Sequence, residues 1–269
     1  MNNVHERSTA ETGFDFAGKV VVIAGGTSGV GLATGVAFAR AGCVDLALVA
    51  RNEERGKAAV ETIAALAPAS RVEFLSADLN EPEAAGEVAD EVRRRFGRID
   101  VLVNSTVAPY QPTLLHEIPI EDLRSILTQQ ALGPLLMTRA ILPIMREQGG
   151  GSIVTIASDA AKVPTPGETG IGAAMAAIVT FSQTLAVEAK RDGIRVNVLT
   201  PSLIVDTASY VRAMARDFSK KIFDKIVSQA SLGLTEPDDL ANAILFLASP
   251  LARRITGQVV SVNGGISVA

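Results

Sequence analysis

The residues best suited to chemistry lie in a glycine-rich turn near the start of the chain. The segment AGGTSGVG, residues 24–31, directly follows an apolar run that ends at residue 24. Gly25 permits a tight turn, while Gly29 and Gly31 would let a pyrophosphate approach backbone N–H groups at the positive end of a helix. A strand-to-helix turn without a ligand is the alternative interpretation. The predicted dinucleotide contacts here are Gly25, Thr27, Ser28, Gly29, Val30 and Gly31.

A second candidate cofactor contact lies where the next apolar run ends, in the segment LVARN at residues 48–52. NAD-selective sites place a carboxylate at this strand end to bind the adenosine ribose. Here Ala50 takes that place and Arg51 follows, and a guanidinium suits a 2′-phosphate through paired hydrogen bonds. We therefore expect NADP(H) rather than NAD(H), unless Arg51 only caps a surface turn. Further cofactor contacts are expected at Asn52, Asp78 and Leu79.

The composition of the chain narrows the classes of function. The 269 residues carry a formal net charge of -4, which argues against a nucleic-acid surface. Residues 1–16 lack the apolar core of a secretory signal, and the longest apolar stretch, residues 169–187, is expected to be a buried helix rather than a membrane span. The single cysteine, Cys43, fits a reducing compartment. We expect a cytoplasmic protein that acts on a small-molecule substrate and needs no metal.

These residues must be positioned by the elements around them, and apolar runs of strand length alternate with helical patterns along the chain. The predicted strands cover residues 19–24, 45–50, 71–76, 99–104, 151–157, 194–199 and 257–265. The predicted helices cover residues 30–41, 53–66, 81–96, 120–146, 167–190 and 237–248. Continuous Val, Ile and Leu runs indicate a parallel sheet buried on both faces. Strict alternation indicates an α/β, doubly wound Rossmann fold with helices on both faces.

No linker or repeat divides this pattern, so we expect a single domain. The predicted domain covers residues 17–269 and follows a flexible N-terminal arm, residues 1–16. Residues 206–232 form the least regular part and are interpreted as a lid over a ligand.

Six motifs, in this order, resemble those of the short-chain dehydrogenase/reductase family. They are the glycine turn, Asp78-Leu79, LGPLLMTRAILPIM, GSIVTIASDAA, GIRVNVLTPSLIVDT and ITGQVVSVNGG, and the resemblance covers about residues 16–269. It implies that Ser158 holds the substrate oxygen and that Pro201 and Thr207 lie at the nicotinamide. It also implies that Asn104 begins the family's Asn-Asn-Ala-Gly segment beside the cofactor. The resemblance further implies a homotetramer or dimer.

The family's catalytic pair, Tyr-x3-Lys, is missing from the helix where it should lie. In the family, the tyrosine transfers a proton to or from the substrate oxygen, and the lysine lowers the tyrosine's pKa. Alignment of AAIVTFSQTLAVEA places these two positions at Ile171 and Met175, and neither side chain can transfer a proton. Three further departures lie around the nicotinamide end: Ser105-Thr106-Val107, Gln130 and Ser202.

Few side chains could replace the missing tyrosine. Tyr110 follows the fourth predicted strand, at the sheet edge where ligands bind, and we predict that it acts with Ser158. His116, Tyr210 and Glu168 are the other candidates, although each could instead serve as a surface cap, as packing, or as a helix N-terminal charge. Asp159 and Lys162 are expected to be solvated.

Three functional hypotheses follow. The first is a divergent oxidoreductase that uses NADP(H) to reduce a small apolar carbonyl or a conjugated C=C bond through an altered proton relay. The second is a non-catalytic homologue that binds nucleotide or partner subunits as a scaffold. The third is a non-redox reaction that uses Ser158 with Glu168. Retention of the glycine turn and Arg51 favours the first.

Overall fold

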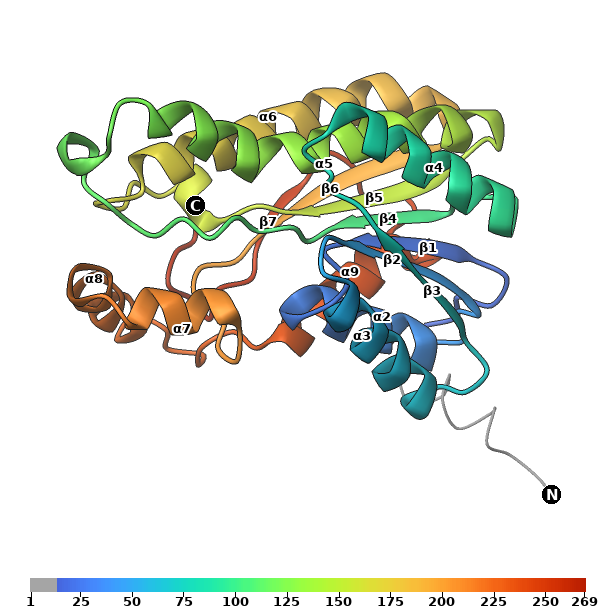
Figure 1. Cartoon of the computed structure of the whole chain (residues 1–269), viewed down its shortest axis with the longest axis horizontal. Helices are drawn as coiled ribbons and strands as arrows, with labels where there is room; N and C mark the ends of the chain where they lie inside the picture. Colours follow the sequence, from blue (N-terminus) through green and yellow to red (C-terminus); the bar gives the residue numbers. More distant parts are fainter. Residues whose placement is uncertain (1–13) are drawn as a thin grey trace.

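The chain folds around one parallel sheet, and the structure, a computed structural model, describes residues 14–269 (Figure 1). The seven strands of the sheet lie in the order β3-β2-β1-β4-β5-β6-β7. Their bounds are β1 Val20–Ala24, β2 Asp45–Ala50, β3 Arg71–Ser76, β4 Val101–Asn104, β5 Gly151–Ile156, β6 Ile194–Thr200 and β7 Val259–Ser261. The strand order reverses between β1 and β4, and ligands bind at such a reversal, outside the carboxyl ends of the strands.

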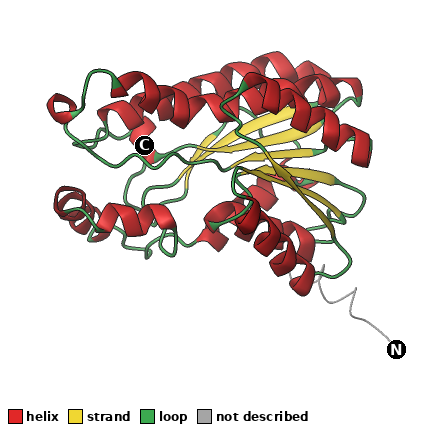
Figure 2. Cartoon of the chain, viewed as in Figure 1, coloured by secondary structure: helices red, strands yellow, loops and turns green. Residues whose placement is uncertain are grey.

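Helices form a layer on each face of the sheet (Figure 2). Helices α4, α5 and α6 contribute to one apolar cluster with the sheet, and α2, α3 and α9 contribute to a second cluster on the opposite face. Their bounds are α2 Gly29–Arg40, α3 Glu53–Leu66, α4 Pro82–Phe96, α5 Asp122–Glu147, α6 Thr169–Ala189 and α9 Pro237–Ala248. The predicted doubly wound fold is therefore confirmed.

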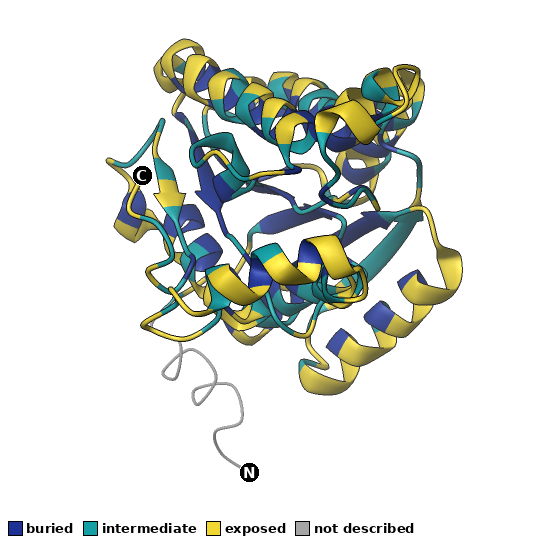
Figure 3. Cartoon of the chain, turned by 90° about the vertical axis from the view of Figure 1, so that its left-hand side faces the viewer, coloured by how far each residue is buried: buried dark blue, intermediate teal, exposed yellow. Residues whose placement is uncertain are grey.

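The central strand β1 shows why the strands read as continuous apolar runs. Val20 and Val22 pack into the cluster under α4, α5 and α6, whereas Val21 and Ile23 pack into the opposite one. Alternate side chains of a strand point to opposite faces, so a sheet with helices on both faces needs apolar residues at every position. Figure 3 shows the buried strands between helices whose outer faces are exposed.

The segment predicted to be irregular contains two helices, α7 (Ala208–Met214) and α8 (Asp217–Val227). They lie beyond the carboxyl ends of the strands, apart from the two helical layers (Figure 1). Their apolar side chains pack with Leu203 in a separate small cluster that includes Ala213 and Phe223. We call residues 203–227 the lid.

The packed domain begins earlier than the sequence predicts. Phe16, assigned to the flexible arm, is 2% exposed, and its ring meets Phe38 edge-on with 4.7 Å between the centroids. Its backbone N–H also donates to the Ala41 carbonyl at 2.8 Å. The rest of the predicted arm, residues 1–13, lies outside the described residues.

Helix α6 is the one described segment whose length and composition would allow it to cross a membrane. The window Thr169–Asp192 has a mean hydropathy of 1.6. In this fold the helix packs beside α5 and over the sheet, and Leu185 and Ala186 belong to the cluster on that face (Figure 1). Its apolar character therefore has an explanation in packing, as the sequence analysis expected.

Candidate functional site

A cleft of about 960 Å³ opens at the carboxyl ends of the strands. Its walls come from the glycine turn, the ends of β2 and β3, the loop after β4, the segment after β5, the first turns of α6, and the lid. These segments are distant in sequence, and the parallel sheet brings them to one edge. The predicted contacts that line the cleft are Gly25, Thr27, Ser28, Gly29, Val30, Arg51, Asn52, Asp78, Leu79, Tyr110, Ser158, Ile171, Met175, Pro201 and Thr207.

The glycine turn is fixed by contacts that exclude side chains. A Cβ on Gly25 would lie 2.5 Å from the Ser105 carbonyl oxygen, and one on Gly31 would lie 2.1 Å from the Gly25 carbonyl oxygen. Gly25 and Gly29 have φ values of +83° and +48°, which favour glycine. Gly31 does not line the cleft, and its lack of a Cβ lets the turn close on itself; its contact with a pyrophosphate stays a prediction.

The start of α2 is open to an anion. Ser28 is the N-cap, but its side chain makes no capping hydrogen bond, and the first turn of α2 contains no acidic residue. A Cβ on Gly29 would meet only the Thr207 side chain, at 3.4 Å, so backbone on this side is accessible. Free N–H groups and the positive end of the helix dipole suit a pyrophosphate. The turn and helix therefore fit a dinucleotide cofactor.

Charged side chains surround the end of β2, where the adenosine of a dinucleotide would lie. Arg51 Nη1 lies 3.5 Å from Asp78 Oδ2, and both side chains are largely exposed, so this ion pair can rearrange at little cost. Asn52 uses its side-chain oxygen to cap α3, accepting from the Arg55 N–H at 2.8 Å. Arg55 also lines the cleft, a contact that the sequence analysis missed although it lies four residues after Arg51.

Asn104 has a different role from the predicted cofactor contact. Its side chain is fully buried, and its amide nitrogen donates to Thr138 and Thr155, both at 3.1 Å. Asn104 therefore joins β4 to α5 and β5 beneath the cleft instead of lining it. Gln130 does line the cleft, and its Oε1 accepts from the Ala108 N–H at 3.3 Å.

The wall where a catalytic pair would lie is apolar. Met175 is 7% exposed and packs with Ala157 and Ile178, and Ile171 packs against the same cluster. Ser158 directly follows Ala157 in the chain. Its Oγ caps the short helix η2 (Asp159–Ala161) by accepting a hydrogen bond from the Ala160 N–H at 3.2 Å. Its hydroxyl hydrogen remains available to a ligand, because this contact uses only the oxygen as an acceptor.

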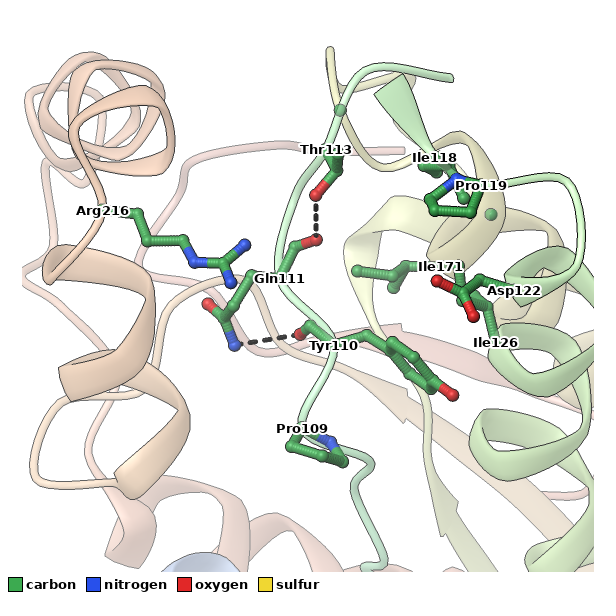
Figure 4. Close-up of a pocket in the computed structure, with 12 residues that line it drawn as sticks. Pro109, Tyr110, Gln111, Thr113, Ile118, Pro119, Asp122, Ile126, Ile171 and Arg216 are labelled. Carbon is green, nitrogen blue, oxygen red and sulfur yellow. Dashed lines mark hydrogen bonds between the residues drawn. The ribbon is translucent and has the colours of Figure 1, made fainter. Parts of the chain in front are cut away.

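The Tyr110 hydroxyl is directed toward α5. It donates to Ser125 Oγ at 2.9 Å, and Ser125 donates to the Asp122 carbonyl at 2.9 Å. The ring lies in a side pocket of about 160 Å³ that Ile171 and Arg216 also line (Figure 4). Tyr110 therefore borders the cleft but has a hydrogen-bond partner outside it.

The remaining substitute donors occupy other places. The His116 side chain is 78% exposed on the short helix η1 (Leu115–Glu117) and lies outside the cleft. Tyr210 lines the cleft from α7 and packs against the lid cluster.

Asp159 is buried, which corrects the expectation that it is solvated. Its side chain is anchored by the C-terminal segment: Oδ2 accepts from Asn263 Nδ2 and from Ser267 Oγ, the latter at 2.9 Å. Its other oxygen, Oδ1, has no hydrogen-bond partner among the described residues. The sequence could not place Asp159, because its partners lie more than 100 residues further along the chain. Lys162 is held similarly, by Ser261 Oγ at 2.6 Å.

Glu168 lines the cleft just before α6 begins. Burial raises its pKa to about 7, and the nearby charge of Asp159 adds to the rise, while a hydrogen bond from Thr165 opposes it. Its side chain makes no capping hydrogen bond to the helix. Glu168 is therefore a carboxyl group that is about half protonated near neutral pH.

Comparisons with known proteins agree with this architecture. A family profile described as "Enoyl-(Acyl carrier protein) reductase" matches residues 24–267. The 3-oxoacyl-[acyl-carrier-protein] reductase FabG of Thermotoga maritima is 30% identical over 252 residues, which cover 93% of this chain and 98% of the relative. Levodione reductase has a similar structure, with a TM-score of 0.87, 28% identity, and coverage of 93% of this chain and 98% of that one.

A further solved structure is similar to this chain over most of its length. An NADPH-bound short-chain oxidoreductase from Pseudomonas aeruginosa, described as containing an atypical catalytic center, superposes with a TM-score of 0.86 and 28% identity. The similarity covers 95% of this chain and 99% of that chain. Together with the sheet order, the glycine turn and the cleft at the strand ends, these similarities show that the chain belongs to the short-chain dehydrogenase/reductase family of oxidoreductases.

Proposed function

We propose that the protein transfers hydride between NADP(H) and a small apolar carbonyl compound or conjugated C=C compound, with a proton relay that does not use the family's tyrosine. The observation that carries the proposal is the pairing, in one cleft, of an open helix N-terminus and Arg51 with an apolar wall at Ile171 and Met175. The helix N-terminus and Arg51 suit a phosphorylated dinucleotide. The apolar wall suits a substrate with little polar surface.

The residues of the cleft would have separate roles in binding and catalysis. The N-terminal amides of α2 would bind the pyrophosphate, and Arg51 with Arg55 would bind the 2′-phosphate. Bound NADP(H) supplies or accepts the hydride. Ser158 would donate a hydrogen bond to the substrate oxygen, while Ile171 and Met175 exclude water from the reacting atoms.

The alternative functions make different use of the same cleft. A nucleotide-binding scaffold would keep the adenosine end and need nothing at the apolar wall, and a non-redox reaction would need Ser158 and Glu168 alone. The Pseudomonas aeruginosa relative supports the oxidoreductase, because an NADPH-bound structure and an atypical catalytic center occur together in one protein of this fold.

We also propose a cytoplasmic homotetramer or dimer. The length of α5 and α6 supports this assembly, as does the outer surface of α6, where Val187 is 63% exposed. Long helices of this kind could pair with a second copy of the chain. Light scattering of the purified protein measures the oligomeric state directly, and a monomer at micromolar concentration would contradict the proposed assembly.

Titration with NADPH and NADH tests the function. We expect NADPH to bind with micromolar Kd, and Arg51→Ala to weaken NADPH about 10- to 100-fold while leaving NADH unchanged, because only NADPH carries the phosphate that the guanidinium binds. Nicotinamide fluorescence reports both titrations. Arg124→Ala, an exposed arginine on α5, is the control and should change neither. Absence of binding by either nucleotide at millimolar concentration would refute the oxidoreductase and favour the non-redox reaction.

A further inference from the structure

We propose that Glu168 is the proton donor that replaces the family's tyrosine, and that Asp159 is a positioning residue that assists it. The proposal rests on the proposed hydride transfer and adds to it the identity of the acid. Three features carry it: the contact between α6 and η2, the anchoring of Asp159, and the lack of a charged partner for Glu168 among the described residues.

The first feature brings the segments that carry Glu168 and Ser158 together at one cleft. The first turn of α6 lies directly on η2, since a Cβ on Gly172 would be only 2.7 Å from the Ala160 carbonyl oxygen. The Gly172 N–H donates to the Glu168 carbonyl at 2.6 Å, so Glu168 precedes this contact by one helical turn. Glu168 and Ile171 are three residues apart and thus lie on one side of the helix. Glu168, Ile171 and Ser158 line the same cleft.

The second feature is the fixed carboxylate next to Glu168. Asp159 is 6% exposed, with one oxygen held by Asn263 and Ser267 and the other, Oδ1, without a partner. A buried negative charge of this kind disfavours a second negative charge nearby. Burial and, to a smaller extent, the nearby Asp159 raise the pKa of Glu168, so Glu168 holds its proton to higher pH than an ordinary glutamate does.

The third feature is that no charged side chain among the described residues pairs with the Glu168 carboxyl, which accepts a hydrogen bond from the neutral Thr165. It makes no helix-capping hydrogen bond, and no ion pair joins it to a described lysine or arginine. The charged groups on the surrounding elements are Asp159 and Lys162 beside η2, Asp122 at the start of α5, and Arg212, Arg216, Lys221 and Lys225 on the lid. Lys162 is engaged by Ser261 and the Ala269 carbonyl, and among these groups only Asp159 shifts the pKa of Glu168.

The proposed step balances as follows for a carbonyl substrate. With NADPH bound, a C–H bond would form at the carbonyl carbon as a C–H bond of the dihydronicotinamide breaks and NADPH becomes NADP⁺, and the π electrons of the C=O bond would move onto the oxygen. That oxygen takes the Glu168 proton, so that an O–H bond forms and the carboxylate is left. Ser158 donates a hydrogen bond to the same oxygen while its charge develops. Solvent in the open cleft then returns a proton to Glu168. In the oxidative direction the carboxylate accepts the proton.

Kinetics of Glu168→Gln test the proposal, with a panel of cyclic enones and activated ketones as substrates. We expect kcat for reduction to fall about 10²- to 10⁴-fold, as for loss of a general acid, while the Kd of NADPH stays within about twofold. In the wild type, reduction should slow above pH 7 because the acid is lost, and oxidation should speed up through the same pH. Glu188→Gln, an exposed glutamate on the same helix, is the matched control and should change neither rate nor profile.

A carboxyl titration without cofactor provides the second readout. In protein labelled with ¹³C at the glutamate carboxyls, one resonance should titrate near pH 7 and disappear in Glu168→Gln. Asp159→Asn should move that titration, and the midpoint of the rate profile, to lower pH, a shift that a purely structural role of Asp159 would not produce. Titration of Glu168 at an ordinary glutamate pKa would overturn the proposal, whichever substrate is found.

The outcomes separate this proposal from the function on which it depends. If neither nucleotide binds, hydride transfer fails and the acid assignment fails with it. If NADPH binds and a substrate is reduced, but Glu168→Gln is as fast as Glu188→Gln, then only the acid assignment is wrong. In that case Tyr110 becomes the donor to test.

Discussion

At the adenosine end of the cleft a ligand meets backbone amides and guanidinium groups, whereas at the nicotinamide end it meets Ile171, Met175 and two carboxyl groups. The first end depends on Gly25 and Gly31, where an added Cβ would collide with backbone oxygens. The second end depends on side chains that project from an intact helix and an intact turn. A helix accepts many side chains at such positions, so the chemistry there can change without change of fold.

This difference indicates which side chains of a nucleotide-dependent enzyme can change without a change of fold. The proposed binding at the adenosine end would depend on chain geometry, so a substitution that removes it would also disturb the strand-to-helix turn. Proton transfer needs only one acid of suitable pKa within reach of the substrate oxygen. A carboxyl group shifted by burial and by a neighbouring charge can meet that need as well as a phenol.

The largest effect is expected from Gly31→Ala, which would break the adenosine end. The new Cβ would lie 2.1 Å from the Gly25 carbonyl oxygen, so the turn must open. We expect the Kd of NADPH to rise roughly 100-fold, which corresponds to about 2.7 kcal/mol, and the free energy of unfolding to fall by about 1–3 kcal/mol. Fluorescence titration and urea denaturation measure the two.

Gly86→Ala is the control for this change. Gly86 lies inside α4, and a Cβ there would have no heavy atom within 4 Å. Alanine in a helix interior should raise the free energy of unfolding by about 0.5–1 kcal/mol and leave NADPH binding unchanged. If Gly31→Ala and Gly86→Ala have the same Kd for NADPH and the same free energy of unfolding, then the glycine turn is not rigid.

A smaller effect is expected from Met175→Lys, which returns the family's lysine to the nicotinamide end. Met175 is buried among apolar side chains, so the ammonium would lack a partner, and the free energy of unfolding should fall by roughly 1–3 kcal/mol. Burial lowers the pKa of such a lysine below its unfolded value, so the loss should shrink as pH rises. Urea denaturation at pH 6 and pH 9 measures this, with Met175→Leu as the size-matched control. If Met175→Lys keeps the wild-type free energy of unfolding at pH 6, then water reaches this wall of the cleft.

The smallest effect is expected from Tyr110→Phe. The hydroxyl bonds to Ser125, and loss of one such hydrogen bond at a partly exposed site should cost at most about 1 kcal/mol of stability. Reduction rates should stay within about threefold of the wild type. A loss of about 10²-fold or more would instead assign proton transfer to Tyr110 and remove it from Glu168.

The fold, and the position of the glycine turn and Arg51 at one cleft, could be predicted because local sequence determines them. The glycine turn follows an apolar strand, and Arg51 follows the next one, so their spacing alone places both at the same sheet edge. Asn104 and Asp159 could not be placed in this way. The contacts of Asn104 with Thr138 and Thr155, and those of Asp159 with Asn263, join residues 34 to 104 positions apart. Such pairings exist only once the sheet and the C-terminal segment are assembled.

The lid packs through its own small cluster of Leu203, Ala213 and Phe223, whereas the sheet is buried in two much larger ones. A unit with so few buried contacts opens at a lower free energy than the whole domain. Amide hydrogens of α7 and α8 should therefore exchange with solvent through local opening, while those of β1, β4 and β5 exchange only when the domain unfolds. Any ligand that closes the lid will first be visible as slower exchange in these two helices.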